Sequence, residues 1–173
     1  MDVFEYFMKE ARRSLDAAEH MRSVSYPLAE DPKIFLGVVS KLHEAHKSIL
    51  KLVLLSNKDC SSVKECEQLP IRDFKKAFDL IQNDTTSAQV LSDKELSALA
   101  ETYDLVLKHR DSPVEFPRKE QFVMCDDDYG TKQLSGELVR RLSDVTKQML
   151  RSVFMKRDFI LSSGKDVSAE DRV

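Results

Sequence analysis

The sequence predicts an all-α fold, a bundle of about five helices with a short β-hairpin or irregular loop before the last helix. Apolar residues recur at three- and four-residue spacing over long stretches, only four glycines occur among 173 residues, and one internal segment departs from the helical pattern. The length fits one domain. We expect it to span residues 1–161, with a disordered tail of small and charged residues at 162–173.

The first two helices are delimited by acidic residues and prolines. Residues 3–24 carry an apolar stripe that begins after Asp2, an N-cap with an acidic residue three positions later, and Pro27 is expected to end this helix. Asp31-Pro32 then opens a helix over residues 32–57 as N-cap and first residue. The apolar stripe of this second helix is wide, which predicts a central position in the bundle.

Three further helices follow the same reasoning. One is expected over residues 70–82, and the next begins at the capping box formed by Ser92 and Glu95. The last begins near Ser135 and keeps its apolar phase through Val153.

The segment 109–134 is the part of the chain that does not fit an amphipathic helix. It holds two of the five prolines and one of the four glycines. Within it, QFVMC and TKQL flank a polar turn, which favours a hairpin across 117–134. The preceding residues Ser112-Pro113-Val114-Glu115 have the order of an N-cap, a first-turn proline and a capping acid, so they predict a single helical turn.

Extrapolating the apolar stripe of the fourth helix places Arg110 on the buried side. A buried guanidinium needs a partner, and Asp111 and Glu115 are the nearest candidates in the sequence. Two interpretations remain open: an ion pair that fixes the corner, or a site that binds an anionic ligand through Arg110, Arg118 and Lys119. A small-ligand pocket here would be lined by Arg110, Glu115 and Arg118.

One pair of histidines and one run of aspartates are of residue types that bind metal ions, but the spacing of neither matches a metal-binding motif. His43 and His46 stand three residues apart, whereas the zinc-protease helix needs a spacing of four. His46 falls within the apolar stripe and His43 at its edge, which predicts a core and a boundary histidine. Asp126-Asp127-Asp128 departs from the calcium-loop pattern at its fifth and sixth positions, so an acidic turn is expected. We expect no metal and no cofactor.

One further pair of residues has the spacing of a catalytic motif. Arg13 and His20 lie seven residues apart on the polar face of the first helix. In HEPN domains, a similarly spaced arginine and histidine near a dimer interface cleave RNA, although that motif usually sits on a later helix. On the last helix, Arg140, Lys147 and Arg151 share an outward face with acidic residues, which predicts a salt-bridged surface.

Two segments resemble a family of small helical proteins that is common in archaea and has no established activity. YPLAEDPK, from Tyr26, is similar to a recurring "TYPL..DPK" pattern with Ser25 in place of the threonine. SPVEFPRKEQFVMCDDD, from Ser112, is similar to "SPVEF.RK..FVI..D", with Met124 in place of isoleucine or valine. The resemblance covers nearly the whole chain. It implies a helical, cytoplasmic protein, with an HEPN-like architecture as an analogy.

The functional expectation is a non-catalytic helical interaction module that self-associates as a homodimer. It rests on the lack of a specific catalytic signature and on apolar residues outside the main stripes, namely Tyr6, Leu36, Leu54 and Leu55. The alternative is an HEPN-like protein that binds RNA or nucleotides, with Arg13 and His20 as candidate catalytic residues of a ribonuclease. The net charge of −3 gives no general reason to expect nucleic-acid or membrane binding, and the unpaired cysteine pattern favours the cytoplasm.

Overall fold

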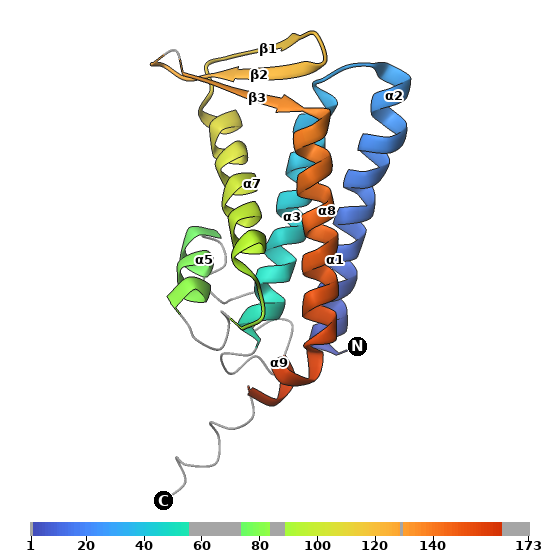
Figure 1. Ribbon diagram of the computed structural model, residues 1–173, viewed down its shortest axis with the longest axis vertical. Coiled ribbons are helices and arrows are strands. Elements are labelled where there is room, and N and C mark those ends of the chain that lie inside the picture. Colours follow the sequence, from blue (N-terminus) through green and yellow to red (C-terminus); the bar gives the residue numbers. More distant parts are fainter. Residues whose placement is uncertain (1, 56–73, 84–88, 129, 164–173) are drawn as a thin grey trace, which may run out of the picture.

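Long helices packed side by side make up most of the structure, and a small sheet lies across one end of them (Figure 1). This computed structural model describes residues 2–55, 74–83, 89–128 and 130–163. The helices include α1 (Val3–His20), α3 (Ile34–Leu54), α5 (Phe74–Asn83), α7 (Asp93–Asp111), α8 (Gly136–Met155) and α9 (Arg157–Ser163). The predicted helical bundle is therefore confirmed, but the described fold is mostly helical with a three-stranded sheet rather than all-α.

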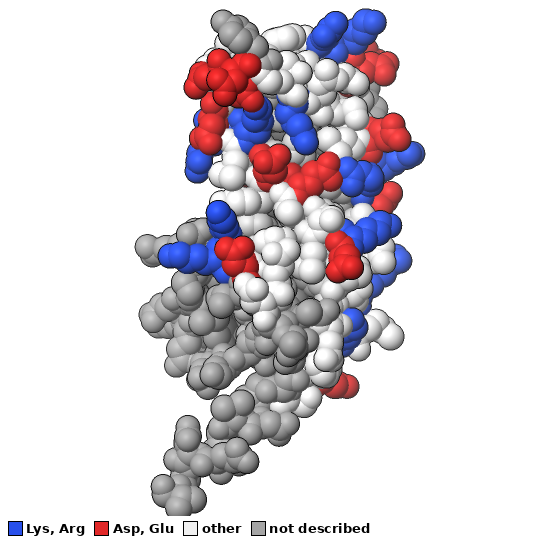
Figure 2. Space-filling view, turned by 60° about the vertical axis from the view of Figure 1, so that its left-hand side comes forward, with Lys and Arg blue, Asp and Glu red and all other residues white. Residues whose placement is uncertain are grey.

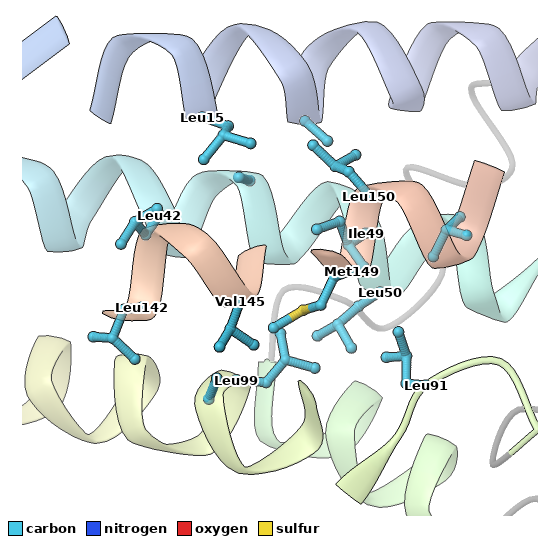
Figure 3. Close-up of a cluster of buried hydrophobic side chains, with 14 of the residues drawn as sticks. Leu15, Leu42, Ile49, Leu50, Leu91, Leu99, Leu142, Val145, Met149 and Leu150 are labelled. Carbon is cyan, nitrogen blue, oxygen red and sulfur yellow. The ribbon is translucent and has the colours of Figure 1, made fainter. Parts of the chain in front are cut away.

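Helix α3 lies at the centre of the bundle, where it contacts α1, α5, α7 and α8. Its side chains Leu42, Ile49 and Leu50 are fully buried, and Figure 3 shows them enclosed by apolar side chains of the surrounding helices. Burying one such side chain stabilises a fold by about 1.5–3 kcal/mol. The central position predicted from the wide apolar stripe is confirmed.

The end of the first helical segment differs from the prediction. Helix α1 is followed by a π-helical turn, η1 (Met21–Ser25), and by the short helix α2 (Tyr26–Ala29), so Pro27 lies inside a helix and does not end one. A proline in the first turn of a helix sacrifices no hydrogen bond, which is why the chain continues through it. The helical path ends instead at Glu30, whose φ of 52° is left-handed. Gly37 of α3 has no side chain, and this leaves room for the side chain of Met21 in the π-helical turn η1.

Asp2, Ser92 and Ser135 begin helices, as predicted. Asp2 accepts a hydrogen bond from the Phe4 amide, and Ser135 accepts one from the Leu138 amide at 3.2 Å. The capping box of Ser92 and Glu95 is present, and the buried Glu95 also accepts a hydrogen bond from Ser152 of α8. Such caps stabilise a helix by about 1 kcal/mol each.

The second helix begins two residues later than expected. The Asp31 carboxylate accepts a hydrogen bond from the Lys33 amide at 2.9 Å and caps a turn, after which α3 starts at Ile34. Residues 56–57 and 70–73 of the predicted second and third helices lie outside the described residues, as does the tail from 164 onward.

The sheet is antiparallel and consists of β1 (Val114–Arg118), β2 (Gln121–Cys125) and β3 (Thr131–Ser135) in that order. The predicted hairpin is confirmed as β2 and β3. The predicted helical turn at residues 112–115 is wrong, because Val114 and the residues after it pair with β2. Local capping signals lose here to pairing with β2, which lies outside the four residues of the capping pattern.

None of the described helices combines the length and the apolar character that crossing a membrane requires.

Candidate functional site

The corner between α7 and the sheet is held by ion pairs and by one hydroxyl group. Lys108 pairs with Asp126, and His109 Nδ1 lies 2.6 Å from a carboxylate oxygen of Glu115. The Ser112 hydroxyl lies 2.6 Å from the Cys125 carbonyl oxygen and 2.9 Å from that of Val114. These contacts tie the end of α7 to β1 and β2, so the segment is an ordered corner rather than a loose loop.

Arg110 is not buried, contrary to the prediction. Its side chain is 69% exposed, and its guanidinium pairs with the neighbouring Asp111 at 2.8 Å. The hydrogen bond from Arg110 holds the pKa of the Asp111 carboxyl below its usual range. Glu115, the other predicted partner, pairs with His109 instead.

The prediction that Arg110 is buried failed because the buried face of α7 is not the face that its apolar residues define. Its buried face includes the polar residues Glu95 and Thr102 together with Ala98, Leu99 and Leu105. The prediction followed the apolar residues alone, and these lie on a face of α7 that is rotated away from the face that is buried. When the buried face is extended by one helical turn, it passes through residue 109, and Arg110 lies beside it on the exposed side.

The four predicted ligand-binding residues are not brought together. Arg110 precedes β1, whereas Arg118 is the last residue of this strand and Lys119 is the first residue of the two-residue turn to β2. The strand separates them by more than about 13 Å, since each residue of a strand adds about 3.3 Å. A pocket lined by Arg110, Glu115 and Arg118 is therefore not formed.

A hollow of about 570 Å³ lies instead at the β1–β2 turn, lined by Arg118, Lys119, Glu120, Gln121 and Gln133. This volume lies within the range of small-molecule sites. Lys119 has a φ of 54°, a left-handed backbone conformation that lets the chain reverse direction in two residues. Sequence reasoning identified Arg118 and Lys119 but missed both glutamines.

The two faces of the sheet differ in character. Phe122, Met124 and Leu134 point into the core of the bundle. The residues that alternate with them form what we call the outer sheet face: Val114, Phe116, Arg118, Gln121, Val123, Cys125, Thr131, Gln133 and Ser135. On this face the side chains of Val114 and Phe116 are exposed, and that of Phe116 is 40% exposed. Val123 is buried between its strand partners Phe116 and Gln133.

Charge is unevenly distributed along the sheet end of the molecule. Asp126, Asp127 and Asp128 occupy the β2–β3 turn, and Arg118 and Lys119 lie at the opposite end of the strands, at the end of β1 and in the turn to β2. Figure 2 shows acidic side chains gathered on one side of this end and basic side chains on the other. The Asp126 carboxylate pairs with Lys108 and accepts a hydrogen bond from the Gly130 amide, as expected of an acidic turn.

The two histidines of α3 are core and boundary residues, as predicted. His46 is fully buried, and its Nε2 lies 2.7 Å from the Thr146 hydroxyl oxygen. His43 stacks against Tyr103 and lies against Phe74. Among the described residues, no three His, Cys, Asp or Glu side chains are grouped to hold a metal ion.

Arg13 and His20 lie exposed on α1, on the face opposite its buried stripe. Arg13 is 4.0 Å from Glu10, and neither residue lines a hollow described above. On α8, Lys147 pairs with Glu19 and Asp144, so the predicted salt bridging is present at Lys147. A groove of about 690 Å³ runs along α8 beside Lys94 of α7, and its cation Arg141 is paired with Glu101 at 2.7 Å.

A second exposed apolar surface lies at the other end of the bundle, where α8 meets α9. Met155 is 81% exposed and Phe154 is 55% exposed, and Phe159 of α9 is also exposed. We call these three residues the α8–α9 corner.

Comparisons with models of protein families, with curated protein sequences and with solved structures gave no match.

Proposed function

We propose that this chain is a non-catalytic helical interaction module that self-associates as a homodimer through the α8–α9 corner. The observation that carries the proposal is the exposure of Phe154 and Met155 to solvent, beside an exposed Phe159. Adjacent apolar side chains exposed at one place are typical of contact surfaces between proteins. A two-fold contact would bring the same patch of both copies together.

The apolar residues that first suggested a second contact surface do not support it. Leu54 and Leu55 are buried, and Tyr6 and Leu36 are partly buried against the same core. We therefore propose the contact at the α8–α9 corner and not on the sides of α1 and α3.

The corner is held rigidly, which favours binding because less conformational freedom is lost on association. Arg157 contacts Asp2 at 3.0 Å and lies over the ring of Phe4, so it fastens the start of α9 to α1. Lys156 donates hydrogen bonds to the carbonyl oxygens of Gln89 and Val90, which fastens the end of α8 to the segment before α7.

Sedimentation velocity over a range of micromolar concentrations tests the proposal. The native chain should sediment as a dimer at the upper concentrations, and Met155→Asp should shift it to a monomer, because a carboxylate would be desolvated at the centre of the contact. Leu28→Asp is the matched control, since Leu28 is also 81% exposed but lies on α2, at the opposite end of the bundle. A native chain that stays monomeric throughout, or an equal effect of both variants, would contradict the proposal.

The alternative is an HEPN-like protein that binds or cleaves RNA through Arg13 and His20. It has less support, because both side chains lie on the open polar face of α1 and Arg13 is near Glu10. Incubating the chain with labelled RNA, with and without His20→Ala, tests it. If the native chain cleaves the RNA and His20→Ala does not, the result would favour the HEPN-like alternative over a non-catalytic interaction module.

A further inference from the structure

The outer sheet face combines groups that suit a flat, anionic ligand with hydrogen-bonding edges. Of its nine strand residues, two expose apolar side chains, Val114 and Phe116, and the polar ones carry amide, hydroxyl or guanidinium groups. None of the nine is a carboxylate, although the whole chain has 30 acidic residues and a net charge of −3. The strands of this face therefore carry no carboxylate, and one carboxylate, that of Glu120, lines the hollow at their end.

Phe116 supplies the flat apolar surface. It lies on β1, an edge strand, and Val123 beside it forms a buried floor. A solvent-exposed aromatic ring on a sheet is a surface on which an unpaired base can stack, and such stacking is tolerant of base identity. The hollow at Gln121 and Gln133 opens on the same face, so amide groups are available beside the ring to hydrogen-bond a base edge.

Arg118 and Lys119 supply the positive charge. Both line the hollow, and no acidic side chain among the described residues lies within ion-pair distance of either. Glu120 also lines the hollow, as the other residue of the turn. Two unpaired cations beside an aromatic ring have the arrangement that single-stranded nucleic acids require, in which phosphates are neutralised while bases stack.

A protein partner fits this face less well. Pro117 lies in the edge strand, and since it lacks an amide hydrogen it opposes the addition of a further strand along β1. Three strands of five residues cover about 17 Å by 14 Å, or roughly 240 Å². That area is enough for two or three bases.

We propose that the outer sheet face is a binding site for single-stranded nucleic acid, in which Phe116 stacks on a base, Arg118 and Lys119 contact phosphates, and Gln121 and Gln133 contact base edges. The site is separate from the α8–α9 corner, so it does not depend on self-association. No covalent step is involved, and the oligonucleotide leaves the site intact.

Fluorescence anisotropy with labelled oligouridine tests the proposal, with the RNA and the matching oligodeoxyuridine as parallel probes at low salt. The native chain should bind at least one of the two, and the ratio of their affinities identifies whether the natural ligand is RNA or DNA. Phe116→Leu keeps an apolar side chain of similar size but loses the aromatic face, and it should weaken binding about tenfold, as expected for one lost stack. Leu28→Ala, at an exposed apolar residue of α2 that belongs to neither proposed surface, is the matched control and should not change the affinity.

The salt dependence tests the cations separately. Arg118→Gln should reduce the slope of log affinity against log salt by about 0.7, the contribution of one phosphate contact to a single strand. Arg140→Gln, an exposed cation of α8, should leave the slope unchanged. Circular dichroism of each variant checks that the fold is retained.

Three outcomes would overturn the proposal: no binding of either probe at low salt, equal affinities for Phe116→Leu and Leu28→Ala, or equal salt slopes for Arg118→Gln and Arg140→Gln. A fourth would reassign the face. If neither probe binds and Phe116→Leu converts a dimer to a monomer in sedimentation, the outer sheet face is a contact with a second copy.

Discussion

At the scale of single residues, the hydrogen bonds of the core determine the protonation state of its histidine. The Thr146 hydroxyl donates its one hydrogen to the Leu142 carbonyl oxygen at 2.8 Å, so it can only accept from His46. His46 is therefore neutral with its hydrogen on Nε2, and its Nδ1 is a buried atom without a partner. Protonation at Nδ1 would place a charge in the core with nothing to receive the new hydrogen. Burial lowers the pKa of His46 to about 3, and burial with the nearby Lys47 lowers that of His43 to about 4.

These low pKa values predict that the fold loses stability as the pH falls below about 6.5. In the unfolded chain both histidines become protonated near that pH, whereas in the folded chain they stay neutral, so protons favour unfolding. Each histidine contributes a slope approaching ~1.4 kcal/mol per pH unit. Urea unfolding between pH 7 and pH 5 should show this loss, and His46→Gln should reduce its slope, while the control His20→Gln, at an exposed position, should not. A slope that His46→Gln leaves unchanged would contradict the buried neutral histidine.

At the scale of elements, the sequence was sufficient where a signal is local. The caps at Asp2, Ser92 and Ser135 and the central stripe of α3 follow from neighbouring residues, and the structure confirms them. The sequence was insufficient where the outcome depends on partners outside the local capping pattern. Val114 and Glu115 join a strand because β2 offers a ladder, and α7 buries Glu95 because Ser92 and Ser152 satisfy its carboxylate.

The sheet is attached to the bundle by its inner face and not by a buried arginine, which predicts opposite results for two substitutions. Phe122→Ala removes a buried ring and should cost about 3–5 kcal/mol of unfolding free energy. Arg110→Met, at an exposed position, should change it by less than about 0.5 kcal/mol. Urea unfolding measures both. If Arg110→Met proved the more damaging of the two, the guanidinium would be a structural anchor after all.

At the scale of the whole molecule, the bundle separates two surfaces of different chemistry. One end carries the outer sheet face with its amide groups and basic turn, and the other carries the apolar α8–α9 corner (Figure 1). Neither surface could be located from the sequence, because the exposure of a side chain depends on which other elements pack against its helix or strand. Leu54 and Met155 are similar side chains in helical segments, yet the first is buried and the second is open to solvent.

Disulfide cross-linking tests the proposed self-association most directly. In a background with Cys60, Cys66 and Cys125 replaced by serine, Met155→Cys should form a covalent dimer on mild oxidation, since a two-fold contact through the α8–α9 corner brings the two copies of residue 155 close together. Leu28→Cys, equally exposed at the other end, should remain monomeric. Cross-linking of Leu28→Cys at the same rate as Met155→Cys, or of neither, would contradict the account.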